Sequence, residues 1–130
     1  MLLDTSGLLC VHHEAEQRHE NAVTFFHAAS TRFTHSYVLA EFVPLCQVRR
    51  LPRSAALSFV VELIDNPLVE VIWVDSLLHR VALAFLQTRL DKTYSLCDAV
   101  SFLLMQQRSI TEALTTDHHF EQEGFRRLLG

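Results

Sequence analysis

Short apolar segments alternate with segments of helical periodicity along the chain, and this alternation constrains the fold more than any other feature. Leu68–Val74 is the clearest predicted strand, because it is β-branched and almost wholly apolar, as a strand covered on both faces requires. Phe33–His35 and Glu112–Thr115 are also predicted as strands, and Phe125–Leu129 as a last strand at the sheet edge. Met1–Leu3 is apolar but too short to assign alone. Short strands separated by helices predict parallel βαβ units.

The segments between these strands carry apolar residues three and four positions apart, which is the spacing of an amphipathic helix. We predict helices over 16–30, from Ser36 as N-cap through Leu45, from Pro52 as first helical residue to the Asn66-Pro67 pair, over 76–89, and from Ser95 to about Gln107. The last begins with Ser95-Leu-Cys-Asp98, which matches a capping box.

Residues 1–130 are predicted to form one domain, because no repeat or flexible linker divides them. The chain is 49% hydrophobic and has only 3 Gly and 3 Pro, which excludes a disordered or low-complexity chain. The formal net charge of −4 gives no general attraction for nucleic acids. Any contact with a polyanion must therefore be local.

We expect a cytoplasmic protein. The N-terminus lacks the basic stretch and apolar core of a secretory signal. Charged residues, among them Glu41, Glu62 and Arg80, interrupt every apolar run before the roughly 20 residues that a membrane span needs. The three cysteines have no C-x-x-C spacing, and their odd number favours reduced thiols in a reducing compartment.

Four carboxylates are placed where they can converge. Asp4 and Asp117 each follow a predicted strand, Asp98 lies in the first turn of a helix, and Glu41 lies about one turn into another helix. In an open parallel sheet, functional groups gather outside the carboxyl ends of the strands. Such acids would repel one another unless a divalent cation neutralised them. Oxygen ligands without a His/Cys set fit Mg²⁺ or Mn²⁺ better than Zn²⁺.

Each carboxylate also has a simpler interpretation. Asp is a preferred N-cap, and Asp4, Asp75 and Asp117 all occupy positions at which a helix can start. The capping box accounts for Asp98 by itself. Glu41 is either the polar edge of an amphipathic helix or an anion placed for function. Spacing alone leaves the caps and the joint site both open.

Four segments, taken in order, resemble the PIN domain family, and within it the VapC-like toxin ribonucleases. The first is the opening Leu-Leu-Asp4-Thr-Ser6, and the second is Val38-Leu-Ala-Glu41-Phe, which resembles the family's helix-borne glutamate motif. The third is Asp91-Lys-Thr-Tyr-Ser-Leu-Cys-Asp98-Ala, which resembles the family's Ser-Leu-Thr-Asp segment. The fourth is Ala113-Leu-Thr-Thr-Asp117-His-His-Phe120 followed by Gly124-Phe125. The resemblance spans nearly the whole chain.

The resemblance implies a fold, a site and an activity. The fold would be a three-layer α/β/α sandwich with a central, mostly parallel sheet of four to five short strands. Asp4, Glu41, Asp98 and Asp117 would form the catalytic metal site, with the hydroxyls of Thr5, Ser6 and Thr115 as neighbours that orient the ligands. The activity would be Mg²⁺- or Mn²⁺-dependent hydrolysis of RNA phosphodiester bonds.

The resemblance also implies partners and shows two departures. The chain would be the toxin of a type II toxin–antitoxin pair, silenced by a cognate antitoxin and forming a homodimer. Cys97 stands where many relatives have Thr, which removes a hydroxyl beside the site, and Tyr94 stands where Trp is frequent. Neither departure changes one of the four acids.

Basic and histidine side chains are candidate RNA contacts. Arg49, Arg50 and Arg53 form the densest basic group and can hold phosphates, although a solvated helix end explains them as well. His119 directly follows the Asp117-His118 pair and can contact phosphate or transfer a proton, with solvation in a loop as the alternative.

Two other functions remain open from the sequence. One is a PIN-like RNA-binding or scaffold module with little catalysis, which the Cys97 departure and the low basicity allow. The other is a metal-dependent nuclease on a similar sheet that acts on structured DNA. Dependence on metal and the choice between RNA and DNA substrates distinguish the three.

Overall fold

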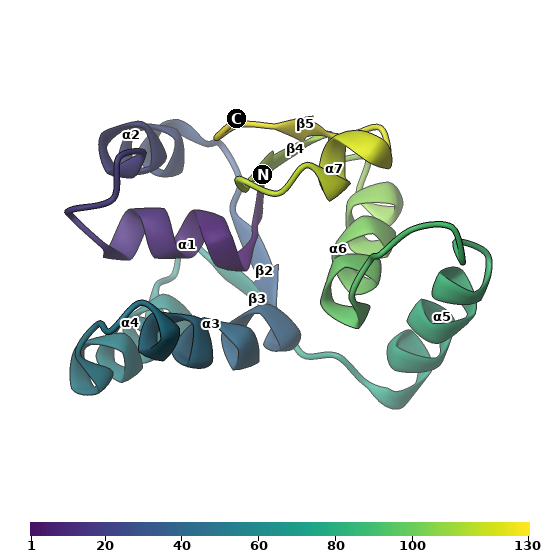
Figure 1. Cartoon of the computed structure of the whole chain (residues 1–130), viewed down its shortest axis with the longest axis horizontal. Coiled ribbons are helices and arrows are strands. Elements are labelled where there is room, and N and C mark those ends of the chain that lie inside the picture. Colours follow the sequence, from purple (N-terminus) through teal and green to yellow (C-terminus); the bar gives the residue numbers. More distant parts are fainter.

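A parallel β-sheet of five short strands forms the centre of the molecule (Figure 1). The structure, a computed structural model, describes residues 1–130. The strands are β1 (Leu2–Leu3), β2 (Phe33–His35), β3 (Glu70–Ile72), β4 (Glu112–Leu114) and β5 (Arg126–Arg127). They lie in the order β3-β2-β1-β4-β5, and every neighbouring pair is parallel. The predicted sheet of four to five mostly parallel strands is confirmed.

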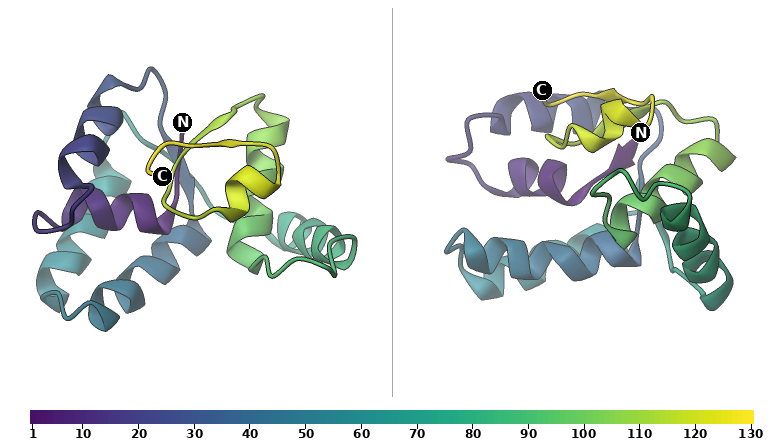
Figure 2. Two further views of the ribbon diagram at one scale, coloured as in Figure 1. Left: turned by 45° about the horizontal axis from the view of Figure 1, so that its top comes forward. Right: turned by 45° about the vertical axis from the view of Figure 1, so that its right-hand side comes forward.

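Seven helices cover the two faces of this sheet. They are α1 (Thr5–His12), α2 (His19–Ala28), α3 (Ser36–Val48), α4 (Arg53–Asp65), α5 (Ser76–Gln87), α6 (Leu96–Gln107) and α7 (His119–Gln122). In Figure 1, α1 to α4 lie to the left of the sheet and α5 to α7 to the right. Figure 2 shows from two other directions that α5 packs on α6. This arrangement is the predicted three-layer sandwich. None of the helices has the length and hydrophobicity that crossing a lipid bilayer requires.

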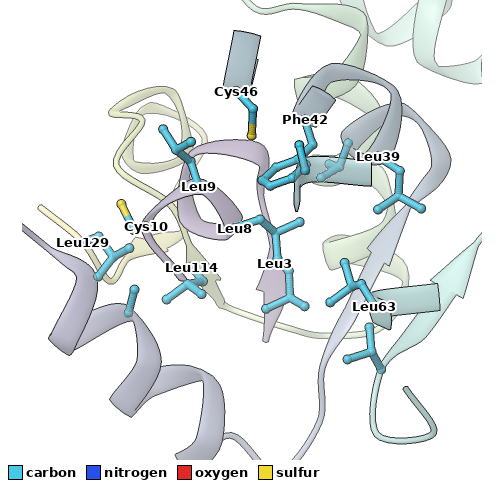
Figure 3. Packing of buried hydrophobic residues seen from close by; sticks show 14 of the residues in the cluster. Leu3, Leu8, Leu9, Cys10, Leu39, Phe42, Cys46, Leu63, Leu114 and Leu129 are labelled. Atoms are coloured by element: carbon cyan, nitrogen blue, oxygen red, sulfur yellow. The ribbon is translucent and has the colours of Figure 1, made fainter. Parts of the chain in front are cut away.

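Alternate residues of the inner strands pack into two separate hydrophobic cores. Leu3 and Leu114 belong to the core beneath α1 to α4, whose packing is shown in Figure 3. Leu2 and Ala113 belong to the core beneath α5 to α7. Successive side chains of a strand point to opposite faces, so a two-residue strand such as β1 can anchor both layers.

The order of the strands places a topological switch between β1 and β4. The chain runs from β1 to β2 and β3 on one side, and then returns to β4 and β5 on the other. Leu3 pairs with Leu114 in this sheet, so Asp4 and Thr115 follow at the same level of neighbouring strands. Connections diverge at such a switch and leave a crevice at the carboxyl ends of the strands.

Gly7 permits the close approach of α1 to β4. A Cβ at this position would lie 1.9 Å from the carbonyl oxygen of Leu114. This helix was not predicted from the sequence, because its residues are buried on most sides and no polar face reveals a period of 3.6. α7 was not predicted either, since a single turn of helix carries no periodic signal.

The prediction that Leu68–Val74 is covered on both faces was wrong. The strand is only Glu70–Ile72 and lies at the edge of the sheet. Leu68 is 67% exposed and Trp73 is 62% exposed. The apolar, β-branched composition correctly identified the strand but did not determine its place in the order, which depends on contacts distant in sequence.

Three helix starts also differ from the predictions. Ser36 is the first residue of α3 rather than its cap, and its hydroxyl accepts a hydrogen bond from the backbone N–H of Val74 (2.9 Å) instead of capping the helix. Pro52 occupies the N-cap position, one residue before α4 begins. The helix expected from Glu16 begins only at His19, after a turn.

Candidate active site

A polar cleft of about 570 Å³ lies at the carboxyl end of the sheet. Its walls contain all four acids that the sequence singled out, namely Asp4, Glu41, Asp98 and Asp117. Thr5, Ser6, Ser95, Thr93 and His119 line it as well. No Lys or Arg side chain lines the cleft. The fold thus gathers negative charge from four separate segments without supplying a fixed positive charge.

Asp4 occupies an N-cap position but does not cap. Its backbone is extended at the start of α1, yet its side chain makes no capping hydrogen bond. Instead Oδ2 accepts a hydrogen bond from Thr115 Oγ1 at 2.7 Å, and Ser6 Oγ lies at 3.4 Å. Burial raises the pKa of Asp4 from 3.8 to about 7, and the charges of Asp98 and Asp117 act in the same direction. The cap interpretation is therefore wrong for Asp4.

Hydroxyl groups from β4 and α1 fix this carboxylate. Thr115 is completely buried, and its Oγ1 also accepts a hydrogen bond from the backbone N–H of Asp117 at 3.0 Å. Ser6 Oγ lies 3.1 Å from Thr115 Oγ1 and accepts from the backbone N–H of Thr116 at 3.0 Å. Thr115 lies behind the cleft, whereas Ser6 lines it. Thr5 lines the cleft too, and its buried hydroxyl has no hydrogen-bond partner.

Asp98 is both a cap and a member of the acidic cluster. Ser95 Oγ accepts from the Asp98 N–H, and Asp98 Oδ2 accepts from the Ser95 N–H, both at 3.0 Å, so the predicted capping box is present. The same Oδ2 lies 3.0 Å from His119 Nδ1. Burial raises the pKa of Asp98, although the hydrogen bonds from Ser95 and His119 oppose that shift. The two interpretations of this residue were not exclusive.

His119 links two of the acids. Its Nδ1 lies 3.4 Å from Asp117 Oδ2 in addition to its contact with Asp98, and its backbone N–H donates to Asp117 Oδ1 at 2.9 Å. Asp98, Asp117 and His119 each offer a ligand atom, and these atoms lie within 4.8 Å of one another. Thr93 Oγ1, 3.1 Å from Nε2, holds the other side of the ring.

The alternative interpretation, a histidine solvated in a loop, is correct for His118 but not for His119. The side chain of His118 is 64% exposed, whereas that of His119 is 15% exposed. Sequence reasoning missed Thr93 altogether, because its partner His119 is 26 positions away and no local pattern marks the pair.

Glu41 faces the same cleft from α3. It is exposed and makes no ion pair, so it fits the interpretation of an anion at the cleft wall. The neighbouring Cys97 is buried, and burial raises the pKa of its thiol, with the negative charge of Glu41 adding to the effect. Cys97 is therefore a neutral packing residue rather than a nucleophile.

The three arginines predicted as RNA contacts lie outside the cleft. Arg49, Arg50 and Arg53 are exposed at the turn between α3 and α4, and none of them lines it. Arg49 lies 3.8 Å from a carboxylate oxygen of Glu16. Contact with RNA through this group remains a prediction that the cleft geometry does not support.

The donor set of the cleft fits a hard divalent cation. The acids are carboxylates, the two most buried have raised pKa values, and no lysine or arginine balances them. Oxygen-rich sites of this kind suit Mg²⁺ or Mn²⁺, and the single imidazole of His119 is also acceptable to Mn²⁺. A bound dication would relieve the repulsion that the fold builds into the cleft.

Comparisons with a family model and with solved structures agree with this geometry. The family model of the PIN domain matches residues 1–125. Among solved structures, VapC20 of Mycobacterium tuberculosis, described as a sarcin–ricin loop cleaving toxin, superposes with a TM-score of 0.86 at 26% identity. The match covers 96% of this chain and 95% of that one. No curated protein matches the sequence.

Proposed function

Because the chain belongs to the PIN domain family, we propose that it is a metal-dependent endoribonuclease of the VapC type. The observation that carries this proposal is the cleft in which Asp4, Glu41, Asp98 and Asp117 meet without a balancing Lys or Arg. The similarity to VapC20, a toxin that cleaves the sarcin–ricin loop, supports RNA as the substrate class.

Asp4, Asp98 and Asp117, together with Glu41, would hold Mg²⁺ or Mn²⁺. When bound, the dication supplies Lewis acidity for the hydrolysis of a phosphodiester. The fit rests on the chemistry of the donors, which are carboxylates that the fold buries or crowds together at a cost in repulsion. The expected products carry 5′-phosphate and 3′-hydroxyl ends.

The protein's own groups hold two of the four acids, Asp4 and Asp98, in place. Thr115 and Ser6 fix the orientation of Asp4, while the Ser95 N–H and the His119 ring fix Asp98. Ligands that are held by hydrogen bonds before the cation arrives lose less conformational freedom on binding it. Thr115 and Ser6 therefore act as positioning residues, as the family resemblance implied.

A cognate antitoxin fits the same cleft. An antitoxin segment that placed an arginine there would pair with the carboxylates that otherwise hold the metal.

We also propose that residues 1–130 form a single domain, that the protein acts in the cytoplasm, and that it forms a homodimer.

A cleavage assay with and without metal tests the function. The chain is purified without partner and tagged at its C-terminus, because Asp4 lies three residues from the N-terminus. Structured RNA and DNA are each incubated in Mg²⁺, in Mn²⁺ and in EDTA. We expect cleavage of RNA that requires metal, with losses of at least about 100-fold for Asp98→Asn and Asp4→Asn. The control Asp65→Asn removes an exposed acid of α4 and should cleave as wild type does.

The outcomes separate the three functions. Equal cleavage of RNA in EDTA, or full activity of both cleft variants, would refute the proposal. Metal binding without cleavage of either nucleic acid would favour an RNA-binding scaffold, and cleavage restricted to structured DNA would favour the third function.

A further inference from the structure

Two further hollows lie beside the acidic cleft, one next to the other. The first, about 410 Å³, shares Ala40, Glu41 and Ser95 with the cleft. The second, about 550 Å³, shares Tyr37 with the first and extends along the start of α5. α3, α5 and α6 all begin at this end of the sheet, at the lower edge in Figure 1. The hollow between Tyr37, His79 and Arg80, called here the α5 groove, is therefore separated from the cleft only by the first hollow.

Arg80 gives the α5 groove a free positive charge. Among the other ten basic side chains, seven pair with carboxylates, and Arg32 donates to backbone carbonyls; the seven are Arg18, Arg49, Arg89, Lys92, Arg108, Arg126 and Arg127. Arg50 and Arg53 are also unpaired, but they line neither the cleft nor the two hollows beside it. Arg80 is exposed in the groove wall and forms neither an ion pair nor a hydrogen bond. Asp75 is the one carboxylate of the groove, and it accepts from the Leu78 N–H at 2.8 Å to cap α5.

Tyr37 gives the same groove an aromatic surface that is held in place. Its hydroxyl contacts His79 Nδ1, and its ring meets the His79 ring edge-on at 5.8 Å. On its other side, the ring lies 6.3 Å from the buried His35. Tyr37 is half-buried and forms part of the wall of both hollows. An immobilised aromatic ring beside a free arginine is the combination by which single-stranded nucleic acids are bound.

We propose that the α5 groove is a binding subsite for single-stranded RNA beside the cleavage site, with a base on Tyr37 and a phosphate on Arg80. This inference rests on the proposed function, since the cleft must receive a phosphodiester for a strand to continue into the groove. The cleft itself has no Lys or Arg, and the chain carries a net charge of −4, so any attraction for the strand beyond that of a bound dication has to come from neighbouring basic side chains. Arg80 is the unpaired cation of the two hollows beside the cleft.

Binding of a short fluorescent single-stranded RNA tests the subsite. The anisotropy of the RNA is measured between about 50 and 200 mM salt in the Asp98→Asn background, so that the strand stays intact. Arg80→Gln should reduce the slope of log K against log salt by about 0.7, the effect of losing one phosphate contact to a single strand. The control is Arg126→Gln. Arg126 lies on β5, at the opposite edge of the sheet, and its charge is paired with Glu112 of β4, so this variant should leave the slope unchanged.

Stacking on Tyr37 is tested by a second pair of variants. Tyr37→Leu should weaken RNA binding by about 5- to 100-fold without changing the salt slope, whereas Tyr37→Phe keeps a stacking surface and most of the affinity. Melting temperatures are measured for each variant. Arg80 is exposed, so Arg80→Gln decides the question even if Tyr37→Leu is unstable.

Two results would overturn the subsite, and both differ from failure of the proposed function. The subsite is wrong if wild type cleaves RNA but Arg80→Gln keeps the parental salt slope, or if a folded Tyr37→Leu variant binds as tightly as its parent. Failure of the proposed function appears earlier, as a wild-type chain that does not cleave RNA in Mg²⁺ or Mn²⁺.

Discussion

Replacing Asp4 by Asn should stabilise the metal-free protein at neutral and alkaline pH. Asp4 is 6% exposed, and burial raises its pKa from 3.8 to about 7. An Asn side chain has nearly the same shape, and its amide oxygen can still accept the hydrogen bond of Thr115. The substitution therefore removes a charge that the fold disfavours and keeps the contact that orients the side chain.

The magnitude follows from the two pKa values. Below about pH 3.8 the carboxyl is protonated in the folded and the unfolded state, so it makes no difference to stability. Between pH 3.8 and 7 the unfolded chain has lost this proton and the folded chain still holds it. The free energy of unfolding therefore falls by about 1.4 kcal/mol per pH unit as pH rises, up to about 4 kcal/mol above pH 7.

Urea denaturation in EDTA from pH 4 to pH 8 measures this effect. The difference in unfolding free energy between Asp4→Asn and wild type should grow by up to about 4 kcal/mol in favour of the variant over that range. Asp98, whose pKa burial also raises, is present in both proteins, so it enters the difference only through its repulsion of the Asp4 charge. Asp91→Asn, which removes an acid with a side chain 76% exposed, should show no such growth.

Metal should reduce the stability advantage of Asp4→Asn above pH 7. Mg²⁺ at about 100 times its dissociation constant stabilises wild type by about 2.7 kcal/mol and should stabilise Asp4→Asn much less. The reasoning fails if the difference between Asp4→Asn and wild type is independent of pH, or if the variant is the less stable protein at pH 8 without metal.

Three further substitutions test the framework around the site, each by urea denaturation. Gly7→Ala should cost at least about 3 kcal/mol, because its Cβ would lie 1.9 Å from the Leu114 carbonyl oxygen; a loss below about 1 kcal/mol would show that α1 moves freely. Thr115→Val should cost about 1–3 kcal/mol, most of it above pH 7, because Asp4 loses its 2.7 Å donor, and a neutral result would contradict that role. Ser95→Ala should cost about 1 kcal/mol through loss of the capping box, and unchanged stability would mean that the box contributes nothing.

The sequence determined the class of fold because local signals report local structure. Strands β2 and β4 were predicted at nearly their observed bounds, and α6 was predicted from its capping box. Leu2 and Leu3 were too few to assign alone, although they form the central strand. Their importance comes from neighbours on both sides, which lie about 30 and 110 positions away in the sequence.

For the site, the motifs identified the four acids but not what each of them does. Asp4 and Asp75 stand at the same position before a helix, yet Asp75 caps α5 and Asp4 does not cap α1. The difference comes from Thr115, 111 positions away, whose hydroxyl takes the Asp4 carboxylate. The residues around Asp4 in the sequence give no indication that Thr115 is its partner.

Residue types and their local order thus determined the alternating elements, the parallel sheet and the set of acids. The strand order, with β1 beside β4, decided that Asp4 and Asp117 line one cleft and that His119 contacts Asp98. The tertiary structure also decided that Tyr37 and Arg80 line a hollow near this cleft. The reason is physical: hydrophobic periodicity and caps act within a few residues, whereas the pairing of strands and the burial of charge depend on groups that only the folded chain brings into contact.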